Sequence, residues 1–378
     1  MKNFNVYPLF DVAPVKAKGS YVYDEAGQEY LDFYGGHAVI SIGHSHPHHV
    51  SAITQQMEQM AFYSNSIVNP LQKQYAEKLG QMSGYEDYQL FLVNSGAEAI
   101  ENAIKLAAFQ NGRKKVLVFD KAFHGRTSLA VQATDNARVR SSLDDNDRMI
   151  RVPLNDEVAL QQHLTEEVAC VIVEGIQGVG GINLPDDQFL QKVSKLCEQK
   201  GALLILDEIQ SGFGRTGKFF AHQYAGVKPH LITVAKGMGN GFPIGGVLIH
   251  PDIEPSFGLL GTTFGGNHLA CAAGLAVLEV MEQENLMDNA LKQGEVLKAA
   301  LKDIEGVVSV RGRGLMLAAE FDAPIKVMRK NLVTAHHLFT GASSHPNVLR
   351  LLPPLGIGEK EITQFMTKVK SVTAHIHG

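Results

Sequence analysis

A lysine and an acid, each at the end of an apolar segment, are the residues best placed to do chemistry. Residues 202–206 have the length and the Leu and Ile content of a strand covered on both faces, and they lead into Asp207. A carboxylate there is desolvated, which proteins tolerate mainly when a cation or a strong hydrogen-bond donor meets it. A second apolar run, 231–235, predicts another short strand that leads to Lys236 in a glycine-rich loop. Glycines at that spacing let the backbone approach a ligand closely.

This pairing of Lys236 with Asp207 suits pyridoxal phosphate. With that cofactor, a lysine forms a Schiff base, and an acid pairs with the protonated pyridine nitrogen so that the ring can accept electrons. The spacing also fits a blander interpretation, because Lys-Gly pairs are common in surface turns and Asp-Glu often marks the exit of a strand. On these residues alone both interpretations stay open.

The string LDEIQSGFGRTGKFFAHQ at 206–223, followed by the lysine block, resembles the signature of the class III pyridoxal-phosphate aminotransferases, which have fold type I. The resemblance runs from YPLF near the N-terminus to LRLLPPL near the C-terminus. It is strongest toward acetylornithine aminotransferases, including relatives that use succinylornithine. It implies that Asp207 binds the pyridine nitrogen, that Gln210 lies near the ring hydroxyl and that Lys236 forms the Schiff base.

A turn between a predicted strand at 90–93 and a predicted helix is a candidate phosphate site. Backbone N–H groups at a helix start, with Ser95 and Gly96 beside them, can cradle a phosphate, although an ordinary Ser N-cap is the commoner explanation. The resemblance implies that Ser95, Gly96 and Ala97 contact the cofactor phosphate. Ile100 departs from relatives, which usually carry Asn there, so any polar contact of that Asn is in doubt.

Candidate substrate residues follow other predicted strands. Phe123 could cover a flat ring, and Arg126 could hold a carboxylate in a bidentate fork; otherwise they are a core residue and a surface charge. The resemblance stacks Phe123 on the cofactor and directs Arg126 to the carboxylate remote from the reacting amine. It also implies that Glu174 pairs with a substrate-binding arginine, and that Arg350, before a Pro-Pro stop, binds an α-carboxylate.

The string GTTFGGN implies an assembly of two chains. By resemblance, Thr263 reaches the cofactor phosphate of a neighbouring subunit and Thr262 lies near substrate, which implies a homodimer with shared active sites. The expected reaction moves the terminal amine of N2-acetyl-L-ornithine or N2-succinyl-L-ornithine to 2-oxoglutarate, giving the acyl-glutamate semialdehyde and L-glutamate in arginine biosynthesis. FHGRT favours acyl-ornithine, because ornithine enzymes tend to have a bulkier aromatic in place of His124. The alternatives are an ornithine, 4-aminobutyrate or diamine aminotransferase, or a glutamate semialdehyde aminomutase.

Composition is that of an ordinary globular protein. The chain has 378 residues, of which 45% are hydrophobic and 19% charged, and its net charge of −5 shows no bias toward nucleic acid or an anionic membrane. No apolar run approaches the length of a membrane span, and the N-terminus lacks a secretory core. The three cysteines are widely spaced, which favours reduced packing residues over disulfides. A cytoplasmic protein is therefore expected.

Two other classes of protein, metal-dependent and nucleotide-binding, would rest on different motifs. A metal site could use His44, His46, His48 and His49, but Pro47 breaks any single helical face. A nucleotide P-loop could use 212–218, which satisfies G-x-x-x-x-G-K, but a phenylalanine follows where Ser or Thr would bind magnesium. The glycines at 237–241 likewise lack the third glycine of a dinucleotide fingerprint.

Strands alternate with helices from about 90 to 250, which predicts an α/β fold with a mainly parallel sheet between helices. The resemblance implies seven strands. Residues 15–34 are expected to form a hairpin, and the string VVSVRGRGLMLAAEF a single strand. The expected domains are a segment at 1–45 that joins a small domain, a large cofactor-binding domain at 46–255, and a long helix with the rest of the small domain at 256–378.

Overall fold

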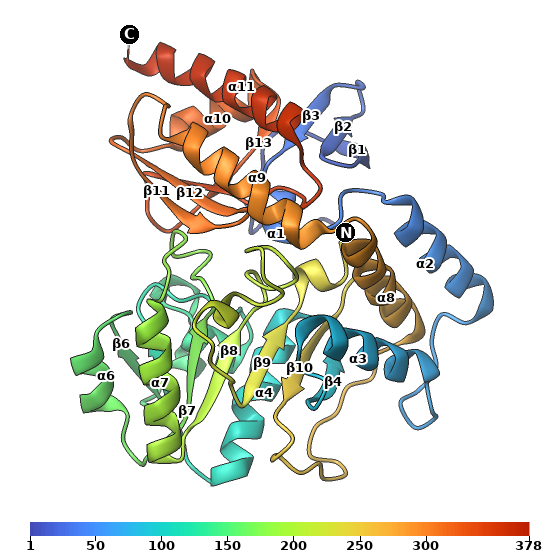
Figure 1. Ribbon diagram of the computed structural model, residues 1–378, viewed down its shortest axis with the longest axis vertical. Coiled ribbons are helices and arrows are strands. Elements are labelled where there is room, and N and C mark those ends of the chain that lie inside the picture. The colour runs from blue at the N-terminus through green and yellow to red at the C-terminus, as the bar shows by residue number, and fades with distance from the viewer. Residues whose placement is uncertain (378) are drawn as a thin grey trace.

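The fold is built on a seven-stranded sheet in a computed structural model that describes residues 1–377. The strand order is β4-β10-β9-β8-β7-β5-β6, in the lower part of Figure 1. Strand β10 is antiparallel to both neighbours, whereas the pairs among β9, β8, β7, β5 and β6 are parallel. The predicted mainly parallel α/β sheet is confirmed. Its strands are β4 (Gln89–Val93), β5 (Lys115–Phe119), β6 (Met149–Val152), β7 (Val168–Glu174), β8 (Leu203–Asp207), β9 (Leu231–Val234) and β10 (Gly245–Ile249).

Helices cover both faces of this sheet because its central strands are apolar on both sides. In β7, Cys170 and Ile172 pack into the core beneath α4 (Gly96–Asn111). The intervening Val171 and Val173 pack on the opposite side with α7 (Asp187–Lys200). This two-residue alternation fixes the face of the sheet to which each side chain of a strand points. Shorter helices α5 (Ser128–Ala133) and α6 (Glu157–His163) complete the two layers.

Residues from both ends of the chain form the upper part of Figure 1. One sheet has the order β1-β2-β3-β13 and the other β11-β12-β15-β14. Strand β13 pairs in parallel with β3, so the two ends of the sequence share a sheet. The strands are β1 (Pro14–Lys18), β2 (Tyr21–Asp24), β3 (Glu29–Asp32), β11 (Val307–Arg313), β12 (Met316–Phe321), β13 (Leu338–Phe339), β14 (Gly341–Ala342) and β15 (Val348–Leu351).

Two local predictions need correction. The hairpin expected at 15–34 is present as β2–β3, with its turn at Asp24–Gly27, but a third strand, β1, joins it because Gly19, with φ of 59°, adds a second turn. The single strand expected in VVSVRGRGLMLAAEF is the hairpin β11–β12, which turns at Gly314 with φ of 53°. The domain boundaries at 45 and 255 stay predictions.

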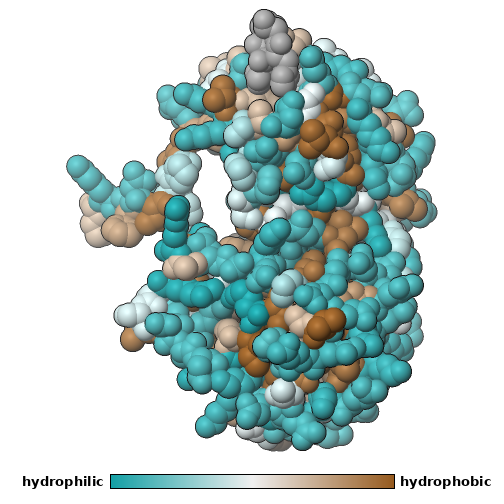
Figure 2. Space-filling view, turned by 90° about the vertical axis from the view of Figure 1, so that its left-hand side faces the viewer, coloured by the Kyte–Doolittle hydropathy of each residue, from teal (hydrophilic) through white to brown (hydrophobic). Residues whose placement is uncertain are grey.

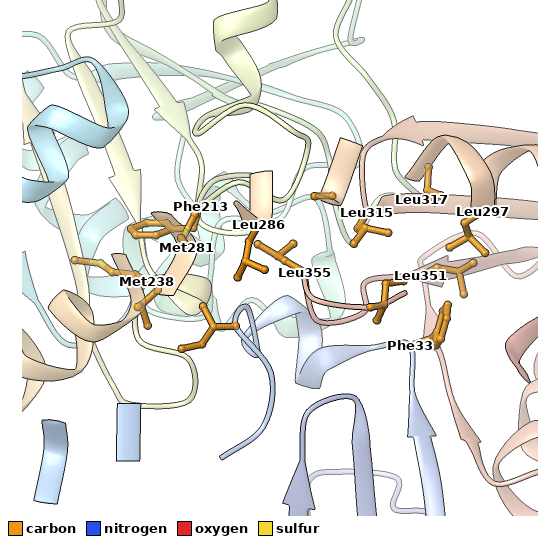
Figure 3. Close-up of a cluster of buried hydrophobic side chains, with 14 of the residues drawn as sticks. Phe33, Phe213, Met238, Met281, Leu286, Leu297, Leu315, Leu317, Leu351 and Leu355 are labelled. Atoms are coloured by element: carbon orange, nitrogen blue, oxygen red, sulfur yellow. The ribbon is translucent and has the colours of Figure 1, made fainter. Parts of the chain in front are cut away.

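The remaining helices pack mainly on one another and on the smaller sheets. Helix α8 contacts both α2 and α3, and α9 packs on the hairpin β11–β12. Figure 3 shows buried side chains from distant parts of the chain, such as Phe33, Phe213 and Leu355, in one hydrophobic cluster. The helices are α1 (Gly35–Ala38), α2 (Pro47–Gln59), α3 (Pro70–Ser83), α8 (His268–Gln283), α9 (Leu286–Leu301), α10 (Lys326–Thr334) and α11 (Glu359–His377).

The face in Figure 2 is mostly hydrophilic, with small groups of hydrophobic residues between polar ones. Over the described part of the chain, no helix combines the length and apolarity needed to span a bilayer.

Candidate active site

Three neighbouring strands deliver the chemical groups to one edge of the large sheet. Strand β7 ends at Glu174 and β8 at Asp207, and these two residues are direct register partners. Strand β9 ends just before Lys236. The carboxyl ends of parallel strands meet at one edge, where open α/β sheets bind ligands. A cavity of about 160 Å³ lies there, lined by Gly96, Ala97, Phe123, His124, Gly125, Glu174, Val179, Asp207, Ile209, Gln210 and Lys236.

The Lys236 amine faces this cavity from a strained backbone position. Its φ of 49° is unusual for a residue with a side chain, and it begins a short 3-10 helix, Lys236–Met238. Burial lowers the pKa of the Lys236 amine, although the charges of Asp207 and Glu174 act in the opposite direction. A lowered pKa increases the fraction of neutral amine, which is the form that acts as a nucleophile or a base.

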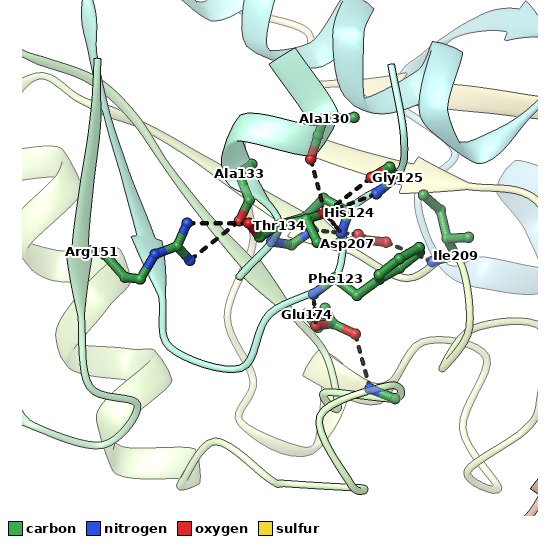
Figure 4. A network of polar contacts seen from close by, with 11 residues as sticks. Phe123, His124, Gly125, Ala130, Ala133, Thr134, Arg151, Glu174, Asp207 and Ile209 are labelled. Atoms are coloured by element: carbon green, nitrogen blue, oxygen red, sulfur yellow. Dashed lines mark hydrogen bonds and ion pairs between the residues drawn. The ribbon is translucent and has the colours of Figure 1, made fainter. Parts of the chain in front are cut away.

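Asp207 is fixed by two donors. Its Oδ1 accepts a hydrogen bond from the backbone N–H of Ile209 at 3.0 Å, and its Oδ2 lies 2.7 Å from Nδ1 of His124. Both side chains are buried, and Figure 4 shows them together behind Phe123. Nε2 of His124 is buried and has no hydrogen-bond partner. A hydrogen bond donated from Nδ1 of His124 would hold the Asp207 carboxylate in one orientation.

Glu174 lies beside Asp207 and is held differently. Its two carboxylate oxygens accept hydrogen bonds from the backbone N–H groups of Phe123 at 3.0 Å and Gly178 at 2.9 Å. Burial raises the pKa of Glu174 to about 7, and the charge of Asp207 adds to the rise, while His124 and the two N–H groups oppose it. The carboxyl can therefore exchange its proton near neutral pH.

The start of α4 forms the predicted helix-terminus site. Gly96 and Ala97 line the cavity, whereas Ser95 is the N-cap residue and its side chain accepts from the N–H of Glu98 at 3.2 Å. A Cβ on Gly96 would come within 2.9 Å of Ile209. Glycine therefore lets the first turn approach the cavity closely, where its free N–H groups suit a phosphate.

Arg350 reaches the cavity wall from β15. Its NH1 group donates to Oε1 of Gln210 at 3.3 Å, and its Nε donates to the carbonyl of Ala342 at 2.6 Å. Nε2 of Gln210 donates to the carbonyl of His37 at 3.1 Å, and the ring of Tyr34 lies 5.9 Å from the Arg350 guanidinium. The structure thus joins Gln210 and Arg350, two residues predicted for different roles.

Three predicted residues lie away from this cavity within the chain. Arg126 is exposed, one residue beyond Gly125 of the wall. Thr262 lines a different cavity, and its Oγ1 accepts from the N–H of Gly265 at 3.1 Å. Thr263 is exposed and lines neither cavity.

The histidine-rich loop does not converge on a common point. His44 pairs with Asp32 at 2.8 Å, whereas His46 pairs with Glu284 just after α8, and His48 pairs with Glu279 within α8. Nε2 of His49 lies 3.1 Å from the carbonyl of Gly239. No group of His, Cys, Asp and Glu in residues 1–377 has the arrangement of a metal site.

Sequence reasoning used His124 only as a mark of substrate class and missed its contact with Asp207. The signal was the position of His124 directly after Phe123, because consecutive residues of a loop can contact different parts of one cavity. The partner 83 positions away could not be read from that signal.

The cavity fits pyridoxal phosphate on this chain's own groups. It offers an amine with a lowered pKa, a buried and oriented carboxylate, an aromatic wall in Phe123 and a helix start opened by Gly96. These are the partners of the cofactor's aldehyde, ring nitrogen, ring face and phosphate. The fold and this site define a pyridoxal-phosphate-dependent enzyme.

The chain belongs to the class-III aminotransferase family, whose pattern matches residues 3–373. It is 41% identical to an acetylornithine aminotransferase of Bacillus subtilis (strain 168), over 98% of this chain and 97% of the relative. A solved ornithine aminotransferase of Toxoplasma gondii has a TM-score of 0.90 and 30% identity, over 98% of this chain and 92% of that one. A solved acetylornithine aminotransferase of Elizabethkingia anophelis has a TM-score of 0.84 and 29% identity, over 99% and 96%.

Proposed function

We propose that this aminotransferase moves the terminal amine of N2-acetyl-L-ornithine, or of its N2-succinyl analogue, to 2-oxoglutarate. The products are the acyl-glutamate semialdehyde and L-glutamate, in cytoplasmic arginine biosynthesis. The observation that carries the reaction type is the cavity in which Lys236 faces Asp207 and Glu174. The choice of acyl-ornithine is supported by relatives named acetylornithine aminotransferase, which are 37–41% identical over nearly the whole chain.

In this proposal different residues of the chain bind different parts of the cofactor. Bound pyridoxal phosphate supplies an aldehyde that takes up the amine and a ring that accepts electrons from the substrate carbon. Asp207, oriented by His124, would accept the N–H of the ring. Phe123 would cover a ring face, Gln210 would serve the ring hydroxyl, and Ser95, Gly96 and Ala97 at the α4 start would hold the phosphate.

The proton at the reacting carbon is the work of Lys236. Its Nζ, with a lowered pKa, takes the proton from the carbon that carries the terminal amine. In the second half-reaction Nζ delivers a proton to the keto carbon of 2-oxoglutarate, which becomes the α-carbon of glutamate. The burial of Lys236 in the cavity wall limits contact between this proton transfer and bulk water.

Two arginines and Glu174 would let the site accept two substrates that carry different carboxylates. Arg126, at the exposed rim, would hold the α-carboxylate of the acyl-ornithine and the distal carboxylate of 2-oxoglutarate. Arg350 would hold the α-carboxylate of the keto acid in a bidentate fork. Burial lowers the pKa of Arg350, and the charge of Glu174 acts in the opposite direction. Glu174 would neutralise this arginine during the amine half. A pKa of about 7 lets Glu174 become neutral when a carboxylate arrives instead.

A homodimer would complete this site. Thr263 is exposed and lies away from its own cavity, beside large apolar side chains that are 41–90% exposed: Phe62, Tyr63, Ile67, Val68 and Phe264. Exposed apolar groups of this size are typical of an interface. We therefore propose that two chains pair through this face, and that Thr263 of each chain serves the cofactor phosphate of the other.

Single half-reactions on the purified holoenzyme test the substrate. The visible absorbance of the lysine-bound cofactor is followed after addition of N-acetylornithine, N-succinylornithine, ornithine or 4-aminobutyrate. Rapid bleaching by an acyl-ornithine supports the proposal and identifies the acyl group. Faster bleaching by ornithine or 4-aminobutyrate would replace the substrate within the same family.

The division between the two arginines has its own test. The change Arg350→Ala should slow the 2-oxoglutarate half-reaction by about 100-fold and leave the acyl-ornithine half nearly unchanged, because loss of a charge-assisted bidentate contact costs about 3 kcal/mol. Equal losses in both half-reactions would contradict this division.

A further inference from the structure

Arg215 is a buried cation that no predicted role uses. Its side chain is only 2% exposed, which makes it one of the largest fully buried side chains in the described chain. All its hydrogen-bond partners are main-chain carbonyls: Leu315 at 3.3 Å, Pro353, and Ile40 at 3.5 Å. Burial lowers the pKa of Arg215 to about 9, although the charge of Asp32 acts in the opposite direction. Such a site holds a guanidinium only where several fixed acceptors converge on it.

Arg215 fastens the segment that carries Asp207 and Gln210 to the hairpin β11–β12. Its carbonyl accepts the N–H of Leu315 at 3.0 Å, and its side chain donates to the carbonyl of the same residue. A Cβ on Gly314 would lie 2.6 Å from the carbonyl carbon of Thr216, so the two backbones are in direct contact. The cofactor-side segment and the hairpin therefore meet as one rigid unit at this point.

The same guanidinium reaches the chain just beyond Arg350. Pro353, whose carbonyl it binds, follows Arg350 by three residues and lies two residues beyond the end of β15. In between, the N–H of Leu352 donates to the carbonyl of Phe33 at 2.9 Å. Arg350 is thus held on the cavity side by Gln210 and on the far side through the Pro353 carbonyl.

These two attachments behave differently when a carboxylate binds. A carboxylate that takes the NH1 group of Arg350 competes with Oε1 of Gln210 for it, so the cavity-side contact is exchanged. The contact from Arg215 to Pro353 is remote from the ligand and stays. Together with the pairing of β15 to β12 and β14, this contact then holds the end of β15 in place.

We propose that Arg215 is a positioning residue, which fixes Arg350 for the α-carboxylate of the keto acid by holding the exit of β15. The inference rests on the proposed role of Arg350 in the 2-oxoglutarate half-reaction. Arginine suits the position because its planar fork binds carbonyls in different directions at once, whereas lysine offers a single centre. A misplacement of about 1 Å at a binding group can slow a reaction by about 100-fold.

The test compares Arg215→Lys, Arg350→Lys and a matched control, Arg313→Lys, as holoenzymes. Arg313 also joins the hairpin to the large sheet's helices, through Asp187 at 3.0 Å, but it lies at the surface and contacts neither β15 nor the cavity. Single-turnover rates are measured against the concentration of 2-oxoglutarate and, separately, of N-acetylornithine. Cofactor content and thermal unfolding are recorded for each variant.

The expected result is that Arg215→Lys raises the half-saturating concentration of 2-oxoglutarate by about 10- to 100-fold and changes that of N-acetylornithine less than about threefold. Arg350→Lys should show the same selectivity, and Arg313→Lys should match the unaltered enzyme. Equal losses in both half-reactions for Arg215→Lys would overturn the inference, because a general loss of structure is not selective. If Arg350→Lys itself shows no selectivity, the proposed function of Arg350 fails, and the inference fails with it.

A second variant covers the case in which Arg215→Lys does not fold. The change Arg215→Met removes the buried charge but also leaves the carbonyl of Pro353 without its donor. It should show the same selective loss of 2-oxoglutarate affinity. An Arg215→Met enzyme with unaltered affinity for 2-oxoglutarate would overturn the inference.

Discussion

The contact between His124 and Asp207 can be tested without any cofactor. The change His124→Leu removes the Nδ1 donor that lies 2.7 Å from Oδ2 of Asp207 and keeps a side chain of similar volume. Asp207 is only 4% exposed, so bulk water has little access to the place of the lost donor. The backbone N–H of Ile209, at 3.0 Å from Oδ1, would be its remaining donor from the contacts described above.

The size of the effect follows from this burial. A hydrogen bond to a charged group contributes about 1.5–3 kcal/mol, and a buried acceptor left without its donor loses that amount in full. The free energy of unfolding of the cofactor-free chain should therefore fall by about 1.5–3 kcal/mol in His124→Leu. His124→Asn should lose less than about 1 kcal/mol, because its amide nitrogen can occupy the place of Nδ1 and donate to the same carboxylate.

Denaturant unfolding of the cofactor-free protein measures both variants under identical conditions. The holoenzymes are then compared for cofactor affinity, which should fall in the same order. Two results would refute the reasoning: a His124→Leu chain within about 0.5 kcal/mol of the unaltered one, or equal losses in the two variants. The first would show that the bond stabilises little, and the second that packing rather than the bond matters.

Three further outcomes are expected at other positions. A raised pKa of about 7 means that folding favours the protonated form of Glu174, so the unaltered chain should lose stability as the pH rises from about 4.5 through 7. Glu174→Gln should remove this loss, and unfolding curves at pH 5 and 8 that still show it would contradict the assignment. Gly178→Ala would place a Cβ 1.7 Å from Oε1 of Gln210, and the displaced amide should weaken cofactor binding by about 1–3 kcal/mol in a cofactor titration. Thr263→Val should weaken cofactor binding while leaving unfolding of the cofactor-free chain unchanged; unchanged cofactor binding would argue against its role across the dimer.

The strands around the site could be predicted because each is a short apolar run that ends at a polar residue. Strand β4, expected at 90–93, spans Gln89–Val93, and β8 and β9 end within one residue of the expected positions. Strand direction could not be predicted in this way. Strand β10 is antiparallel to both neighbours, yet its buried residues resemble those of a parallel strand. Apolar content reports burial, whereas direction depends on the path of the connecting chain.

Candidate site residues could be predicted where a motif carries them, and their contacts could not. Gly96, Phe123 and Lys236 line one cavity although the sequence separates them widely. The contact between Gln210 and Arg350, by contrast, joins a turn after β8 to β15, 140 positions away, and no local pattern encodes it. Arg215 lies inside the string that carries the family resemblance, and nothing in that string predicts that its side chain is buried.

Ile100, at the position where the family resemblance implies Asn, does not line the cavity. The side chain is fully buried in the apolar cluster between α4 and the large sheet, with Val93 and Ile172 in the same cluster. An asparagine there would need a hydrogen-bond partner among apolar neighbours, which isoleucine does not. The phosphate site depends on main-chain N–H groups of the first turn, at Gly96 and Ala97, and residue 100 lies a full turn further on. Ile100 therefore strengthens the packing that holds the helix start in place, and the groups that face the cavity are unchanged.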